Sequence, residues 1–296
     1  MVLEFKHDAT KNITVISASK RSQRPTVYSE RTLCPFDKGN EKSTPPTTFA
    51  LPENNWKVRC FENLYPVLKK EGEFKKGNDG EFWTSKAVGM HEVIVETNEH
   101  GELFQNFTQN QLQLILKAYK NRFQFFTENN EYAFLFKNHG KGSGASIDHE
   151  HSQIIGLPFT PQLIQQESKL CEHNCFFCNP GEPVLETSFF KVIAPPFARF
   201  PLEVWIIPKR HVKTFLELTE QEGMDLMLVL KKVITKEYEK SKDYTIAFHS
   251  GPKNSEFHFH VEFYPRPNVW GGIELGTGVI VNTKTDQDVK ELFQNP

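Results

Sequence analysis

The chain has 296 residues, of which 38% are hydrophobic and 24% are charged, and its formal net charge is −2. This composition supports a buried core and argues against global disorder, and the absence of a long Lys/Arg run argues against a nucleic-acid partner. No window of about 18 apolar residues occurs, so we expect no membrane span. The first residues lack the apolar core of a signal peptide, so we expect a cytoplasmic location.

Two stretches of the sequence match each other without a gap, residues 91–111 and residues 202–222. Three aligned pairs share one offset: Glu92 with Glu203, His100 with His211, and Thr108 with Thr219. Because the matched positions carry histidines as well as apolar residues, we interpret the two stretches as copies of one structural unit.

Each copy is expected to begin with a buried strand, at residues 93–95 and 204–207. A helix then follows, and Thr108 or Thr219 stands at the position of its N-cap. Glu222 lies three residues after Thr219, which completes a capping box.

A second strand is expected after each helix, at residues 132–136 and 244–248, and a His-x-His sequence follows each strand. The Pro-rich segment near residue 160 indicates the boundary between the copies. We therefore predict an α+β fold of two halves, residues 1–165 and 166–296, each an antiparallel sheet with a packed helix.

The second half contains a set of residues that suits a structural zinc site. A C-x-x-C knuckle supplies two thiolates on one turn, and two imidazoles can complete a tetrahedron with no open position. The expected ligands are Cys175, Cys178, His211 and His258.

The first half offers a counterpart in which one cysteine is replaced by a carboxylate. Its expected ligands are Cys34, Asp37, His100 and His149. A carboxylate oxygen is an acceptable zinc ligand, but the loss of one soft donor predicts weaker binding. The alternative is that Asp37 is a loop residue and that this site holds no metal.

Residues 142–153 combine a loop of small residues with a His-x-His-x-Gln sequence. The glycines allow the backbone to approach a ligand, and backbone N–H groups can bind phosphate oxygens. In a strand, His149, His151 and Gln153 share one face because side chains alternate. One imidazole can therefore bind metal, while His151 attacks phosphorus and Gln153 donates a hydrogen bond to the phosphoryl group.

The segment GASIDHEHSQIIGLP (residues 144–158) resembles the active-site segment of the galactose-1-phosphate uridylyltransferase family, in the histidine-triad superfamily. It is most similar to the ADP-glucose phosphorylase branch of that family. The likeness extends over nearly the whole chain, through ITVIS with Arg21 and Arg24-Pro25, CPFDKGNE, VRCFENLYP, GMHEVIVETNEH, FKNHG and the C-terminal GGIELGTGVIVN.

The resemblance implies two histidine-triad-like halves, of which the second is a degenerate, structural copy. It implies that His151 becomes nucleotidylated, that Gln153 contacts the transferred phosphoryl group, and that the carbonyl of His149 orients the ring of His151. It also implies ligand-binding roles for further residues: Arg21, Arg24, Asn138 and Ser146 for phosphates, and Asn63 for the nucleoside.

The implied activity is transfer of a nucleoside monophosphate from a nucleotide sugar to phosphate or a sugar phosphate. Zinc is the expected metal, and a homodimer is one expected assembly. Two alternatives stay open: hydrolysis of the nucleotide substrate, and a zinc-stabilised nucleotide-binding protein without turnover.

Three positions depart from the family pattern. Glu150 replaces a proline, and it either raises the pKa of His151 or lies on the opposite face of the strand. Asp37 replaces a cysteine. Asn268 and Ile273 stand where uridylyltransferases carry a Lys and a Tyr that serve the sugar phosphate, so galactose 1-phosphate is not a secure substrate.

Overall fold

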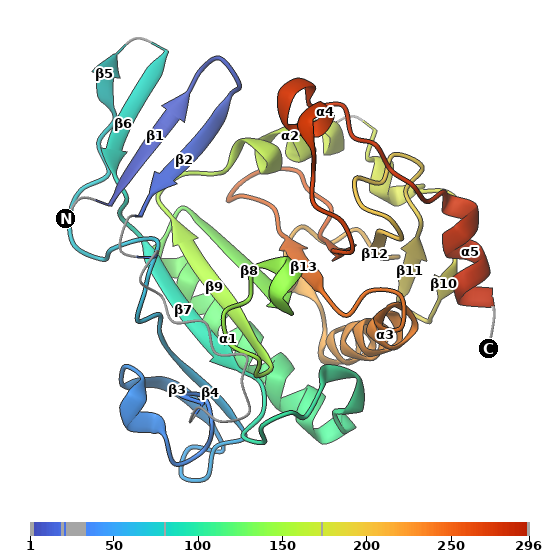
Figure 1. The fold of residues 1–296 in the computed structure, drawn as a ribbon, viewed down its shortest axis with the longest axis horizontal. Coiled ribbons are helices and arrows are strands. Elements are labelled where there is room, and N and C mark those ends of the chain that lie inside the picture. The colour runs from blue at the N-terminus through green and yellow to red at the C-terminus, as the bar shows by residue number, and fades with distance from the viewer. Residues whose placement is uncertain (1–2, 19–20, 22–33, 80, 173, 295–296) are drawn as a thin grey trace.

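One ten-stranded antiparallel sheet runs through the molecule (Figure 1). The computed structural model describes residues 3–18, 21, 34–79, 81–172 and 174–294. From edge to edge the strands are β10 (Leu185–Glu186), β11 (Phe190–Ile193), β12 (Val204–Pro208), β14 (His260–Pro265), β13 (Tyr244–His249), β8 (Tyr132–His139), β9 (His151–Leu157), β7 (Met90–Val95), β4 (Val58–Glu62) and β3 (Thr47–Leu51).

The sheet consists of two halves with the same internal strand order. β8 of the first half and β13 of the second half pair at the centre, with Tyr244 opposite His139 and Phe248 opposite Leu135. The predicted α+β fold of two repeated halves with antiparallel strands is therefore confirmed, and the two sheets are continuous across β8 and β13. The predicted boundary between residues 165 and 166 falls within helix α2 (Gln162–Cys171) and stays a prediction.

Helices α1 (Gln109–Asn129) and α3 (Glu220–Tyr238) pack together against one face of the sheet (Figure 1). Thr108 Oγ1 accepts a hydrogen bond from Gln111 N at the start of α1. Thr219 and Glu222 form the predicted capping box at the start of α3. These caps satisfy backbone N–H groups that the first helical turn leaves without partners.

A single hydrophobic core lies between the sheet and these two helices and includes residues of both halves. The helices approach closely at Gly223, where a Cβ atom would lie 2.9 Å from a methyl carbon of Leu116. The face of the sheet opposite the helices carries the odd-numbered side chains of β9, since Ile154 belongs to the core.

A separate four-stranded sheet has the order β2 (Ile13–Ser17), β1 (Glu4–Asp8), β6 (Phe82–Lys86) and β5 (Gly77–Asp79). It lies at the opposite end of the molecule from the C-terminal helix (Figure 1). Phe5 anchors it through edge-to-face contacts with Phe74 and Phe159. Of its four strands, only residues 13–17 (ITVIS) belong to a segment that the family resemblance included.

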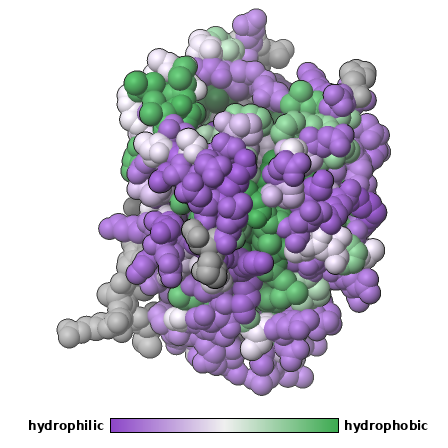
Figure 2. All heavy atoms as spheres, turned by 90° about the vertical axis from the view of Figure 1, so that its right-hand side faces the viewer, coloured by the Kyte–Doolittle hydropathy of each residue, from purple (hydrophilic) through white to green (hydrophobic). Residues whose placement is uncertain are grey.

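The chain ends with α4 (Gly272–Thr277) and α5 (Asp286–Gln294), and Val289 of α5 is buried in the core. The side of the molecule on the right in Figure 1 is largely hydrophilic, with a narrow hydrophobic band and a hydrophobic cluster near the top (Figure 2). Among the described helices, none is long and apolar enough to cross a membrane.

Candidate active site

His151 is the first residue of β9, and its ring is oriented by a hydrogen bond two residues back. Its Nδ1 lies 2.7 Å from the carbonyl oxygen of His149. A carbonyl oxygen can only accept, so Nδ1 carries the proton and Nε2 keeps its lone pair. The carbonyl contact implied by the family resemblance is thus present, and it leaves the lone pair of Nε2 unused by this hydrogen bond.

The environment of His151 keeps the ring uncharged at neutral pH. Burial is the largest cause that lowers the pKa of His151 to about 4, and it outweighs the hydrogen bond to the His149 carbonyl, which raises the pKa. The ring of Phe36 meets His151 edge-to-face, with the centroids 5.2 Å apart. The imidazole is therefore both unprotonated and held in place by packing.

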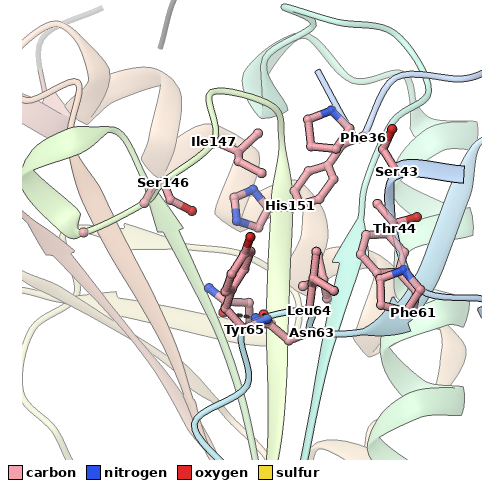
Figure 3. A pocket seen from close by; sticks show the side chains of 16 residues that line it. Phe36, Ser43, Thr44, Phe61, Asn63, Leu64, Tyr65, Ser146, Ile147 and His151 are labelled. Atoms are coloured by element: carbon pink, nitrogen blue, oxygen red, sulfur yellow. Dashed lines mark hydrogen bonds between the residues drawn. The ribbon is translucent and has the colours of Figure 1, made fainter. Parts of the chain in front are cut away.

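His151 opens into a pocket of about 240 Å³. Figure 3 shows Phe36 beside the imidazole, Ser146 and Ile147 on one side, and Asn63, Leu64 and Tyr65 below it. The lining is mostly apolar, with a few polar groups close to His151, which is typical of a site for a small organic ligand.

The small-residue loop before His149 contributes Gly144, Ala145 and Ser146 to this pocket. Asp243 of the second half holds the loop, because its Oδ2 accepts from Gly142 N at 2.9 Å. Gly140 has a φ of 79°, and a Cβ there would lie 1.8 Å from Asp243 Oδ1. Glycine is therefore required at this position, and the loop is tied to the other half of the molecule.

Glu150 lies on the opposite face of the strand from His151. It forms ion pairs with Lys137 and with His139, the latter at 3.1 Å, and accepts from Phe104 N at 3.2 Å. Burial would raise the pKa of Glu150, but Lys137 and His139 lower it well below its ordinary value. The second of the two interpretations of Glu150 is correct: its charge is neutralised away from the nucleophile.

The other expected binding residues differ in whether they line the pocket at His151. Asn63 and Ser146 line the pocket with Gln153. Arg21 donates to the carbonyl oxygen of Tyr65 at 2.9 Å, on the pocket wall. Asn138 is outside the lining set, and its Oδ1 accepts from Thr245 Oγ1 at 3.1 Å. Arg24 lies outside the described residues.

The expected ligands of the first metal site come together. Asp37 Oδ1 lies 2.9 Å from His100 Nδ1 and 3.1 Å from His149 Nδ1, and Cys34 Sγ lies 3.7 Å from His149 Nδ1. His149 Nε2 lies 2.9 Å from the carbonyl oxygen of Thr97, which directs Nδ1 toward the cluster. One ligand atom from each of the four residues lies within 4.8 Å of the others, so this cluster could hold a metal ion.

The second expected site has the same construction. Cys178 Sγ lies 3.2 Å from His211 Nδ1, and both Cys175 Sγ and Cys178 Sγ lie 3.6 Å from His258 Nδ1. His258 Nε2 contacts the carbonyl oxygen of Pro208 at 3.0 Å, as His149 contacts that of Thr97. This cluster too could hold a metal ion.

A third cluster, which the sequence motifs did not predict, could also hold a metal ion and consists of Glu167, His249, His260 and Glu262, of which all but Glu167 are buried. His249 Nδ1 lies 2.9 Å from Glu167 Oε2, and His260 Nε2 lies 3.5 Å from Glu262 Oε1. Glu167 and His249 belong to no local motif, and only the fold brings them to β14. His260 repeats the geometry of His151, but Phe177 stacks on its ring at 4.0 Å.

His91 on β7 is a further buried residue near the site that the sequence motifs did not predict. Its Nε2 lies 3.0 Å from Gln153 Oε1. The sequence carried one usable signal, since His91 alternates with Val93 and Val95 on the face that His151 shares.

Comparison with known proteins agrees with this geometry. The family model "Galactose-1-phosphate uridyl transferase, C-terminal domain" matches residues 134–267, and "Domain of unknown function (DUF4931) N-terminal domain" matches residues 53–159. The chain is 32% identical to the galactose-1-phosphate uridylyltransferase of Thermotoga maritima, over 95% of this chain and 94% of that protein. This chain belongs to the galactose-1-phosphate uridylyltransferase family of nucleotidyltransferases.

The family includes proteins of both branches considered from the sequence. The chain is 31% identical to ADP-glucose phosphorylase of Arabidopsis thaliana, over 98% of this chain and 92% of that protein. A crystal structure of ADP-glucose phosphorylase from Arabidopsis thaliana with bound ADP-glucose has a TM-score of 0.79 at 29% identity, covering 99% of this chain and 98% of that one. A structure of uridylyltransferase has a TM-score of 0.81 at 25% identity, covering 99% and 97%.

Proposed function

We propose that this enzyme moves a nucleoside monophosphate from a nucleotide sugar to phosphate or a sugar 1-phosphate through a covalent intermediate on His151. One observation carries the proposal. The hydrogen bond from His151 Nδ1 to the His149 carbonyl leaves the Nε2 lone pair available on a ring that lines the pocket.

The reaction consists of two displacements at one phosphorus atom. In the first, Nε2 of His151 attacks the α-phosphorus, and the bond from that phosphorus to the bridging oxygen breaks. The sugar 1-phosphate leaves with the bonding electron pair. In the second, an oxygen of the acceptor phosphate attacks the same phosphorus, and the electron pair of the N–P bond returns to Nε2.

The Nδ1 proton stays in place through both displacements. While the N–P bond exists, the imidazole ring is positively charged, and the carbonyl oxygen of His149 stabilises that charge through the 2.7 Å hydrogen bond. Gln153 and Ser146 both line the pocket, which supports their proposed roles as donors to the transferring phosphoryl group. The substrate class follows the relatives named ADP-glucose phosphorylase and galactose-1-phosphate uridylyltransferase.

The surroundings of Glu150 favour an active enzyme over a binding protein without turnover. The binding-protein alternative depended on a negative charge next to His151. Lys137 and His139 neutralise that charge on the far side of the strand. The pocket beside His151 also remains open.

The two clusters that contain cysteine suit zinc in a structural role, because four protein ligands leave no open coordination position. We expect the stronger site at Cys175, Cys178, His211 and His258, and the weaker one where Asp37 replaces a thiolate. When bound, the ion in the first site fixes His149, whose carbonyl orients His151. The homodimer, the cytoplasmic location and the absence of a nucleic-acid partner stay predictions.

An acceptor test separates transfer from hydrolysis. The protein is incubated with UDP-glucose or ADP-glucose, with and without phosphate or galactose 1-phosphate, and the products are separated by anion-exchange chromatography. We expect exchange only when a phosphorylated acceptor is present. Steady release of UMP or AMP without an acceptor would instead show a hydrolase.

A further inference from the structure

His91 and Gln153 are diagonal neighbours on adjacent strands. In the pairing of β7 with β9, Val93 lies opposite Gln153 and His91 lies opposite Ile155. All four side chains point to the pocket face of the sheet, where diagonal pairs can touch. The His91 ring is 5% exposed and belongs to none of the candidate metal clusters among the described residues.

The backbone N–H of Val67 fixes the direction of the hydrogen bonds around His91. Val67 N lies 3.3 Å from His91 Nδ1, and since a backbone N–H only donates, Nδ1 accepts. The neutral ring then carries its proton on Nε2, which donates to Gln153 Oε1 at 3.0 Å.

Asn63 is fixed in the same way. Tyr65 N donates to Asn63 Oδ1 at 2.9 Å, so the amide nitrogen of Asn63 lies on the other side. That nitrogen lies 3.1 Å from His91 Nε2 and 3.4 Å from Gln153 Oε1, so the three polar side chains meet at one point. Asn63 is itself held to β7, because its backbone N–H donates to the carbonyl oxygen of His91 at 2.9 Å.

Gln153 Oε1 is therefore turned toward two donors, and the amide nitrogen of Gln153 is turned away from them. A flipped amide would place that nitrogen against the Nε2–H of His91 and the amide nitrogen of Asn63, with no acceptor between them. Within the described part of the chain, Gln153 Nε2 has no hydrogen-bond partner, so both of its N–H groups are available to a ligand.

We propose that His91 is a positioning residue for nucleotidyl transfer, which holds the amide of Gln153 so that its N–H groups point at the transferring phosphoryl group. The inference rests on the proposed function and assigns a role to a residue outside the His-x-His-x-Gln segment. The side chain acts through Gln153 and does not touch the nucleotide.

The test measures single-turnover formation of the nucleotidyl-protein with ADP-glucose and UDP-glucose, together with the Kd of each nucleotide sugar. His91→Leu removes the donor to Gln153, and we expect the rate to fall about 10- to 100-fold, the range typical of lost supporting hydrogen bonds at a site. The Kd should change much less. His91→Gln should restore most of the rate, because its amide nitrogen can reach Gln153 Oε1.

His91→Asn is the matched control, since its shorter side chain is polar but does not reach Gln153. It should be as slow as His91→Leu, and it keeps the test valid if the leucine variant does not fold. In a Gln153→Ala background, His91→Leu should cause little further loss, because the two residues act as a unit.

Three results would overturn the inference while the proposed function stands. The first is a wild-type rate of adduct formation in His91→Leu or His91→Asn, and the second is a His91→Gln variant no faster than His91→Asn. The third is a loss of rate on His91→Leu that is equally large with Gln153 and with Gln153→Ala. If the wild-type protein itself forms no adduct, the proposed function fails and this inference fails with it.

Discussion

Buried carboxylates in this protein differ in whether a cationic side chain neutralises their charge. Glu92 accepts two hydrogen bonds from the Arg122 guanidinium, at 2.8 and 2.9 Å. Glu150 pairs with Lys137. Glu237 of α3 is fully buried, and neither of its carboxylate oxygens has a hydrogen-bond partner in the described part of the chain. Burial raises the pKa of Glu237 to about 8, so it is held as the neutral acid below that pH.

Glu237 makes the stability of the fold depend on pH. Its folded-state pKa lies above that of an unfolded glutamate, about 4.3. The contribution of neutral Glu237 to the free energy of unfolding is therefore fully present below about pH 4.3 and is lost as the pH rises through about 8. We expect Glu237→Gln to raise Tm relative to the wild type, by an amount that grows between about pH 5 and about pH 8.5.

Differential scanning fluorimetry across this pH range measures the effect. Glu239→Gln is the control, because Glu239 is exposed on the same turn of the helix and should leave the pH profile unchanged. A wild-type pH profile in the Glu237 variant would show that this carboxyl group is not the source.

At the residue scale, the sequence predicted which residues lie near His151 better than it predicted their contacts. The spacing of His151 and Gln153 placed them on one face of β9, because strand alternation is a local rule, whereas His149 was expected in the strand and lies before it. The partner of Glu150 could not be predicted, since Lys137 reaches it from another strand. His91 was missed for the same reason, because its contact with Gln153 exists only once β7 and β9 are paired.

Each half holds its metal cluster in the same way at the scale of the elements. A turn with a C-x-x-C or C-x-x-D sequence supplies two ligands. The segment after the first matched strand supplies a histidine, and the first histidine of His-x-His supplies the fourth ligand. The first cluster differs because Asp37 gives an oxygen where the second cluster has a sulfur.

The donor sets predict unequal zinc affinities. We expect chelator competition to release zinc from the wild-type protein in two steps, the first from the Asp37 site. Cys178→Ser should lose the tightly bound zinc and lower Tm, since metal binding and folding are coupled. Asp37→Cys should move the first release step to a higher chelator concentration, because it completes two thiolates.

Metal analysis by inductively coupled plasma mass spectrometry checks the stoichiometry. Full zinc content and an unchanged Tm in Cys178→Ser would show that the second cluster is not a zinc site. A first release step that Asp37→Cys leaves unchanged would remove Asp37 from the ligand set.

Local signals also decided which elements could be predicted. The capping box of Thr219 and Glu222 predicted the start of α3, and the repeated strand and His-x-His patterns predicted both halves. The pairing of β8 with β13 carries no such signal, since no local sequence pattern specifies which strand of the other half lies beside each of them. The small sheet was not predicted because β1 pairs with β6, which lies far along the chain, and local sequence patterns do not report such pairing.

At the scale of the whole molecule, two similar halves carry one candidate catalytic site. Both contain a histidine whose Nδ1 contacts the carbonyl oxygen two residues back, at 2.7 Å for His151 and 2.9 Å for His260. Phe36 meets His151 with its edge and leaves the pocket open, whereas Phe177 stacks on His260. Glu262 also stands where the first half has Gln153. We therefore expect chemistry in the first half alone.

The most direct test of the central claim is the intact mass of the protein after mixing with UDP-glucose or ADP-glucose in the absence of an acceptor. We predict the added mass of one UMP or AMP per chain, mapped by peptide sequencing to His151. His151→Asn should abolish the adduct while keeping its fold, and His7→Asn, a histidine of the small sheet, should form it normally. A full adduct in His151→Asn, an adduct on His260, or no adduct despite measured binding of the nucleotide sugar would contradict the account.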